Sequence, residues 1–262
     1  MSTIRTRITG ALALGGALAA LLTGCIAAPA SHRPLPKSDD PVSLAPDGFT
    51  TEIDNIFWPM EPGTRWIYRE LDPDGSELTV DVTVTTATKK IANGIDARVV
   101  RDTVSRNGEV VEDTFDWYAQ DAAGAIWYLG EDTAEFENGE IVSREGSFEA
   151  GVDGALPGVA LPARPRPGMS YRQEYLAGEA EDNGTVLSVH ELVEVPYGRF
   201  DGAVLTRDTN ALEPDAAELK FYAPGVGPVL TLDISGGNGR EELVSVTMVP
   251  DGTGTGPLGS PD

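Results

Sequence analysis

Residues 78–85 read Leu-Thr-Val-Asp-Val-Thr-Val-Thr, so apolar and polar side chains alternate at every position. Alternation with a period of two is typical of a β-strand that has one buried face and one solvated face. Similar runs occur at residues 111–117 and 187–195, and pairs such as Asn93-Gly94 and Asn107-Gly108 separate the alternating segments. Because Asn-Gly favours the tight turns of β-hairpins, the sequence predicts an all-β fold, an antiparallel meander of consecutive strands.

The second half of the chain repeats features of the first half, in the same order and about 105 residues later. The corresponding residues are Trp66 with Tyr171, Arg101-Asp102-Thr103 with Arg207-Asp208-Thr209, and Tyr118 with Tyr222. β-rich chains also share turn residues and aromatics by chance, but a preserved order and spacing favours duplication. We therefore expect two duplicated β units, at residues 56–149 and 162–250, joined by a linker at 150–161. Together they would form a curved sheet or a half-barrel.

The amino terminus resembles the signal of a bacterial lipoprotein. Arg5 and Arg7 precede an apolar run of 15 residues, and residues 22–25 read Leu-Thr-Gly-Cys. This tetrad resembles the lipobox, whose cysteine receives diacylglycerol while the preceding peptide is removed. The apolar run is shorter than the roughly 18 residues that span a bilayer, which argues against a transmembrane anchor. The resemblance implies a signal peptide at residues 1–24 and lipidation of Cys25.

The ends of the mature chain have the composition of loops, and its charge limits its partners. Residues 25–55 carry five prolines between Pro29 and Pro46 and predict an extended tether, whereas the Gly- and Pro-rich residues 251–262 predict a disordered tail. The net charge of −23 argues against nucleic acid as a partner. We expect an exported protein whose lipid holds it to the membrane, on the outer face of the plasma membrane or at the outer membrane.

The body resembles a group of uncharacterised bacterial secreted proteins and lipoproteins. The resemblance rests on residues 57–68 (Phe-Trp-Pro-Met-Glu-Pro-Gly-Thr-Arg-Trp-Ile-Tyr), residues 113–121 (Asp-Thr-Phe-Asp-Trp-Tyr-Ala-Gln-Asp) and residues 221–227 (Phe-Tyr-Ala-Pro-Gly-Val-Gly). It implies a β-rich envelope protein and assigns no activity. A looser similarity is to envelope lipid carriers of the LolA type, whose curved half-barrel encloses an apolar cavity.

Catalytic and metal-binding motifs are scarce. His190 is the one histidine in the expected body, and the chain has no nucleophile elbow, phosphate loop or HExxH motif. Residues 70–81 place Glu70, Asp72, Asp74, Gly75 and Asp81 at positions 1, 3, 5, 6 and 12 of a calcium-loop template, but Pro73-Asp74-Gly75 also fits a hairpin turn, which we favour. We predict no cofactor, no metal and no enzymatic activity. A hydrolase built on paired carboxylates stays an alternative.

Aromatic residues are the remaining candidates for a site. All four tryptophans lie in the first unit, and Trp117 and Trp127 each precede a tyrosine, Tyr118 and Tyr128. Such rings usually fill cores, but their asymmetric distribution also fits a pocket. We therefore predict that these four residues bind a small apolar or wall-derived ligand. The alternative is a structural module that docks another envelope protein.

Overall fold

The computed structural model describes residues 34–71, 75–235 and 239–260, and in these ranges the fold is all-β. The one helical element among them is a single 3-10 turn at Pro46–Gly48. The strands are β1 (Phe49–Thr50), β2 (Thr64–Leu71), β3 (Glu77–Lys90), β4 (Asp96–Arg106), β5 (Glu109–Asp121), β6 (Ile126–Glu137), β7 (Glu140–Ser143), β8 (Phe148–Glu149), β9 (Leu156–Leu161), β10 (Ser170–Arg172), β11 (Glu174–Tyr175), β12 (Asp182–Val195), β13 (Gly198–Asn210), β14 (Ala217–Ala223), β15 (Gly227–Ser235) and β16 (Arg240–Met248). The predicted fold class is confirmed.

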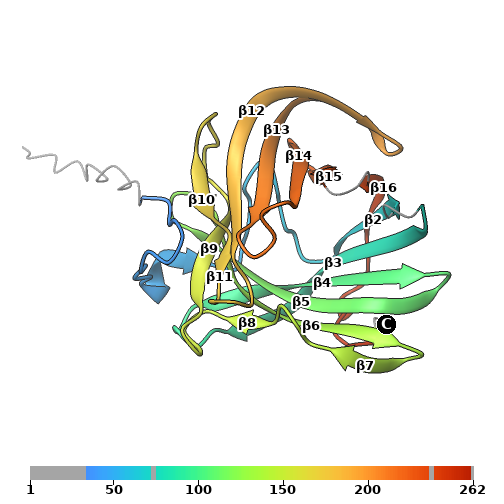
Figure 1. The fold of residues 1–262 in the computed structure, drawn as a ribbon, viewed down its shortest axis with the longest axis horizontal. Coiled ribbons are helices and arrows are strands. Elements are labelled where there is room, and N and C mark those ends of the chain that lie inside the picture. The colour runs from blue at the N-terminus through green and yellow to red at the C-terminus, as the bar shows by residue number, and fades with distance from the viewer. Residues whose placement is uncertain (1–33, 72–74, 236–238, 261–262) are drawn as a thin grey trace, which may run out of the picture. The chain divides into compact units, whose positions relative to one another are not determined.

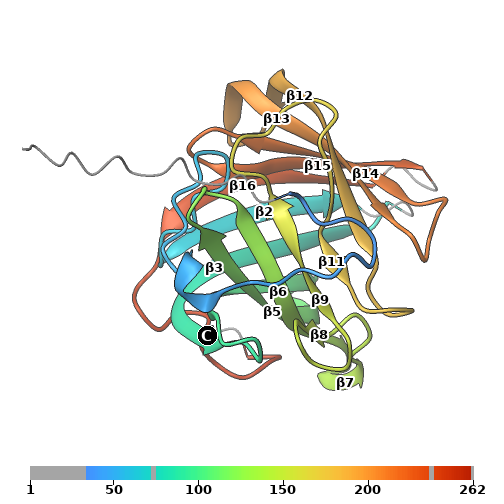
Figure 2. The same ribbon diagram turned by 90° about the vertical axis from the view of Figure 1, so that its left-hand side faces the viewer.

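These strands form one antiparallel sheet whose two ends approach each other. The order across the sheet is β10-β12-β13-β14-β15-β16-β2-β3-β4-β5-β6-β9-β11. β16 pairs with β2, so the two predicted units share the sheet (Figure 1). β10 and β11 stand at opposite ends of this order, yet only Gln173 separates them in the chain. The sheet is therefore nearly closed, with a seam beside β9 and β11 (Figure 2).

The pairing registers of the two units correspond residue by residue. Reading across neighbouring strands, the matching rows are Trp66–Val82–Asp102–Thr114 and Tyr171–Gly184–Asp208–Glu218. Tyr118 lies opposite Arg98, and Tyr222 lies opposite Val204, which is the same relation in the second unit. The rows follow the spacing found in the sequence, and the duplication itself stays a prediction. They place Asp102 and Asp208 at equivalent positions.

The segment expected to be a linker, residues 150–161, contains strand β9 instead. β9 pairs with β6 on one side and with β11 on the other, so it belongs to the closure of the sheet. At Gly158 a Cβ would lie 2.0 Å from the carbonyl oxygen of Gln173, and the glycine therefore permits the close approach at the seam. Arg172 Nη2 also donates a hydrogen bond to the Pro157 carbonyl, at 2.8 Å.

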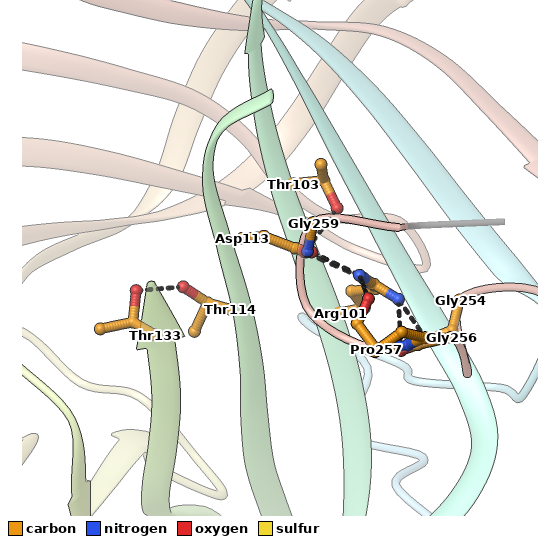
Figure 3. Close-up of polar contacts among 9 residues, drawn as sticks. All are labelled: Arg101, Thr103, Asp113, Thr114, Thr133, Gly254, Gly256, Pro257 and Gly259. Atoms are coloured by element: carbon orange, nitrogen blue, oxygen red, sulfur yellow. Dashed lines mark hydrogen bonds and ion pairs between the residues drawn. The ribbon is translucent and has the colours of Figure 1, made fainter. Parts of the chain in front are cut away.

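The structure also differs from the predicted disordered tail. Through residue 260, the carboxyl-terminal segment folds over Arg101, which is 1% exposed and pairs with the buried Asp113 on β5 (Figure 3). The Arg101 guanidinium donates to the carbonyls of residues 254, 256 and 257, at 3.3, 2.9 and 2.9 Å. The backbone N–H of Gly259 donates to Asp113, at 2.6 Å. The loop-like composition of this segment agrees with its lack of regular secondary structure. Its backbone carbonyls nevertheless hold it in place, because they accept hydrogen bonds from the buried Arg101 guanidinium.

The described part of the predicted tether, from residue 34 onward, packs along the sheet. Leu35, Val42 and Leu44 contact the core, and β1 pairs with β5. Phe49 meets the ring of Trp127 edge to face, with a centroid distance of 6.0 Å. The two chain ends therefore both cover strands of the first unit. Cys25 and residues 1–24 lie outside the described residues.

Candidate functional site: a cavity lined by tyrosines and carboxylates

The inner face of the first unit is set by strand alternation and one irregularity in β6. Tyr118 pairs with Tyr128 and Asp116 pairs with Glu131, while the register between these pairs shifts. Gly130 lies at the shift with φ of +135°, and a Cβ there would lie 2.3 Å from the Phe148 carbonyl oxygen. This glycine allows β6 to bend under β8, so that Tyr128 and Glu131 face the same side.

The second unit contributes the opposite wall of the interior from β13 and β14. Asp208 pairs with Glu218, Thr206 with Lys220, and Val204 with Tyr222, so these side chains share one face. Tyr222 is the register equivalent of Tyr118, and both tyrosines line the interior. An aspartate and a tyrosine thus recur at equivalent register positions in the two halves, Asp102 with Tyr118 and Asp208 with Tyr222.

Between these walls lies a cavity of about 480 Å³. Its aromatic lining consists of Trp58, Tyr118, Tyr128 and Tyr222. The Trp58 ring lies 5.4 Å from Tyr118 and 5.7 Å from Tyr222, so it bridges the two units. Tyr118 and Tyr128 stack at 5.0 Å. This volume is within the range of small-molecule sites, about 300–1,000 Å³.

Beside β5, β6 and β11 the cavity is rich in carboxyl groups whose ionisation is disfavoured. Burial, followed by the nearby Asp116 carboxylate, raises the pKa of Glu131 to about 8. Burial also raises the pKa of Asp116 to about 7, although Tyr128 Oη donates a hydrogen bond to its Oδ1 at 2.6 Å. Burial and a hydrogen bond with Asp182 raise the pKa of Glu174. Near neutral pH these groups hold protons that exposed carboxylates would have lost.

The second-unit side carries a cation. Lys220 Nζ lies 3.6 Å from Asp208 Oδ2 and 3.3 Å from Glu218 Oε2. Gln173 Nε2, from the seam, donates to the same Asp208 oxygen at 3.2 Å. The other oxygen, Oδ1, is buried and has no hydrogen-bond partner among the residues that the structure describes. Such a carboxylate oxygen can still accept a donor.

The four aromatic residues predicted to bind a ligand divide between the two faces. Tyr118 and Tyr128 line the cavity, whereas Trp117 and Trp127 are not among its lining residues. Trp127 is 1% exposed and its Nε1 donates to Asp121 Oδ2 at 3.0 Å. Trp117 lies under Lys89, whose Nζ is 3.8 Å from the ring centroid, beside a separate shallow hollow. Of the four predicted ligand-binding residues, this cavity contains Tyr118 and Tyr128, and ligand contact stays a prediction for all four.

Sequence reasoning missed Trp58, Tyr222 and the cavity carboxylates as site residues. Tyr222 was already identifiable as the counterpart of Tyr118. Trp58 lies in the loop before β2, where neither strand period nor turn chemistry predicts the direction of a side chain. The carboxylates were hidden among 42 acidic residues.

The other sequence candidates do not join this cavity. His190 is exposed on β12. In the calcium-loop candidate, Asp81 pairs with Arg65, while residues 72–74 lie outside the described ranges. Within those ranges no group of three or more histidine, cysteine or acidic side chains is arranged to hold a metal ion. The described residues also include no helix with the length and apolar character needed to span a membrane.

No protein family and no curated protein sequence matches this chain. Solved structures resemble it at low identity. A candidate exported protein with a YmcC-like fold from Bacteroides fragilis is 14% identical with a TM-score of 0.44, over 73% of this chain and 99% of its own. A candidate lipoprotein from Parabacteroides distasonis is 12% identical with a TM-score of 0.41, over 74% and 99%. A β-barrel-like protein of a domain of unknown function from Brucella abortus is 14% identical with a TM-score of 0.34, over 71% and 98%.

Proposed function

We propose that this chain is an exported, lipid-anchored envelope protein that binds a small molecule, without catalysis, inside its sheet. The observation that carries the proposal is the cavity of about 480 Å³ between Trp58, Tyr118, Tyr128 and Tyr222. The cavity opens to solvent on one side and its volume lies in the range of small-molecule sites, so a ligand can enter it from outside. The lipobox at residues 22–25 supports the anchor at Cys25.

The lining changes the kind of ligand that the sequence led us to expect. A purely apolar molecule would leave Glu131, Glu174 and Asp208 buried without new partners, which costs free energy. Aromatic rings beside polar groups suit a ligand that has an apolar body and polar substituents. We therefore favour a small polar molecule over a lipid chain.

Native mass spectrometry of the full-length protein, purified in mild detergent, tests this function. We expect a bound species of small mass on the wild-type protein. Ala160 lines the cavity and is buried, so Ala160→Leu should reduce the bound fraction by filling part of the space. Ala211→Leu at an exposed position is the matched control and should leave that fraction unchanged. A clean apo mass for all three proteins under gentle conditions would contradict the proposal.

The anchor is tested separately. Cys25→Ala should move the protein from the detergent phase to the aqueous phase, because a diacylglycerol supplies most of the membrane affinity. Equal partitioning of the two proteins would refute lipidation and leave the cavity proposal standing.

A further inference from the structure

Acidic side chains outnumber basic ones around the cavity, and those whose pKa is raised by burial become ionised when a cation binds beside them. Six acidic residues line it, namely Glu131, Glu174, Asp182, Asp208, Glu213 and Glu218. Lys220 is the one basic side chain among its described lining residues, and it already contacts Asp208 and Glu218. A cavity of this kind attracts cations and repels anions, and the low local dielectric strengthens both effects.

The hydrogen-bonding capacity of the lining is unbalanced in the same direction. Ionised carboxylates only accept hydrogen bonds. Asp208 lines the cavity and is 7% exposed, yet its Oδ1 lacks a partner in the described chain. Acceptor groups therefore outnumber donor groups in the lining, which favours a ligand that carries N–H groups.

The aromatic lining provides a surface for the rest of such a ligand. Tyr118 and Tyr128 stack beside Glu131, and Trp58 joins them to Tyr222 near Lys220. Ring faces attract cations and also pack against apolar groups. The rings and the carboxylates lie in one cavity, so a single ligand can contact both.

Building on the proposed function, we infer that the ligand is an organic cation: a protonated amine with an apolar body. Its N–H groups bind the carboxylates and its body packs on Tyr118, Tyr128 and Trp58. Burial raises the pKa of Glu131 to about 8 in the empty cavity. A bound ammonium stabilises the ionised form of this carboxyl and so replaces the proton that it holds.

Calorimetric titration of the full-length protein with three probes of similar shape tests the inference. The probes are 2-phenylethylamine as the cation, 2-phenylethanol as the neutral analogue and 3-phenylpropanoate as the anion. About 150 mM salt limits adventitious attraction to the acidic surface. We expect the amine to bind at least about tenfold more tightly than the alcohol, which corresponds to about 1.4 kcal/mol. The anion should bind least.

Variants locate the site of binding. Glu131→Gln should lower the affinity for the amine by about tenfold and leave that for the alcohol unchanged, since it removes one carboxylate and keeps the shape. Glu137→Gln, at an exposed position on the same strand, is the control and should change neither affinity. Glu174→Gln provides a second cavity variant if Glu131→Gln folds poorly.

The outcomes separate this inference from the proposed function. Equal affinities for amine and alcohol, tighter binding of the anion, or no measurable binding of the amine would overturn the assignment of a cation. If the alcohol or the anion binds and Ala160→Leu weakens that binding, the cavity function stands with a different ligand class. If a probe binds and Ala160→Leu leaves its affinity unchanged, that probe does not bind in the cavity. The cavity function itself is then overturned.

Discussion

The two units share a strand register around Asp102 and Asp208 but differ in what covers their outer faces. Arg101 and Arg207 are register equivalents, opposite Phe115 and Leu219 respectively. Arg101 is buried with Asp113 under the carboxyl-terminal segment, whereas Arg207 is exposed. The position equivalent to Asp113 is occupied by Ala217, opposite Thr209. The same local frame thus holds a buried ion pair in one unit and a solvated arginine in the other, because the carboxyl-terminal segment covers Arg101 and leaves Arg207 exposed.

The inner faces differ in a complementary way. The first unit supplies Asp116 and Glu131 without a contacting cation among the described side chains, whereas the second supplies Lys220 between Asp208 and Glu218. On one side of the cavity the carboxyl groups therefore have no neighbouring cation among the described side chains. On the other side Lys220 offsets the two carboxylates. The units have diverged in charge on both faces while keeping their backbone pairing.

The largest expected effect on the free energy of unfolding comes from removing Asp113, the buried partner of Arg101 in the first unit. Asp113→Ala would leave the Arg101 guanidinium buried without its carboxylate, which typically costs about 3–5 kcal/mol. Chemical denaturation of the variant and the wild type measures this difference. The double variant Arg101→Met/Asp113→Leu should lose less, because it removes the uncompensated charge. If Asp113→Ala lowers the free energy of unfolding by less than about 1 kcal/mol, the carboxyl-terminal segment over Arg101 does not exclude water.

Removal of the carboxyl-terminal segment that covers Arg101 should lower the free energy of unfolding by a smaller amount. Deleting residues 251–262 takes away three backbone acceptors of Arg101 and exposes the ion pair to water, which then replaces part of the lost hydrogen bonding. We expect a loss of about 2 kcal/mol. Hydrogen exchange should accelerate in β4 and β5 and stay unchanged in β13 and β14. Uniform acceleration across both units would contradict a local role for the segment.

Three buried carboxyl groups predict a dependence of stability on pH: Asp116 and Glu131 beside the cavity, and Glu241 on β16. In the folded protein burial raises the pKa of Asp116 and Glu241 to about 7 and that of Glu131 to about 8, whereas unfolded carboxyls ionise near about 4. Between these values the folded state binds more protons than the unfolded state, so stability should fall as pH rises from about 4 to about 8.

Calorimetry checks this trend. We expect the melting temperature at pH 8.5 to lie at least about 5 °C below that at pH 5, since about 1 kcal/mol shifts it by 2–4 °C in a chain of this size. Glu131→Gln should flatten the profile, and the exposed Glu137→Gln should not. A melting temperature that rises over this interval would refute the assignment of buried, protonated carboxyls.

The sequence predicted strands, turns and the correspondence of the units because each rests on local patterns. The two-residue period placed Trp117 and Tyr118 on opposite faces, but it does not say which face encloses a cavity. That choice depends on closure of the sheet at Gln173, on the shift at Gly130 and on chain ends that cover the outer face. These are long-range contacts, so the tyrosines and the tryptophans were equivalent candidates.

The covering segments were unpredictable for a related reason. Residues 251–260 contain no periodic apolar pattern, and they bind the first unit through backbone carbonyls, which every residue carries. Their position is determined by the buried guanidinium of Arg101. In the sequence, Arg101-Asp102-Thr103 and Arg207-Asp208-Thr209 look alike, and the absence of an acid at Ala217 was the available sign that only one arginine has a buried partner.

The smallest effect should come from the matching change in the second unit. Arg207→Met alters an exposed side chain on the outer face of β13, where the register equivalent of Asp113 is Ala217. No buried carboxylate is left uncompensated, and the register partner Leu219 offers the methionine an apolar neighbour. We expect a change within about 0.5 kcal/mol, measured by the same denaturation. A loss comparable to that of Asp113→Ala would mean that the outer face of the second unit is covered in solution, and the contrast between the units would then fail.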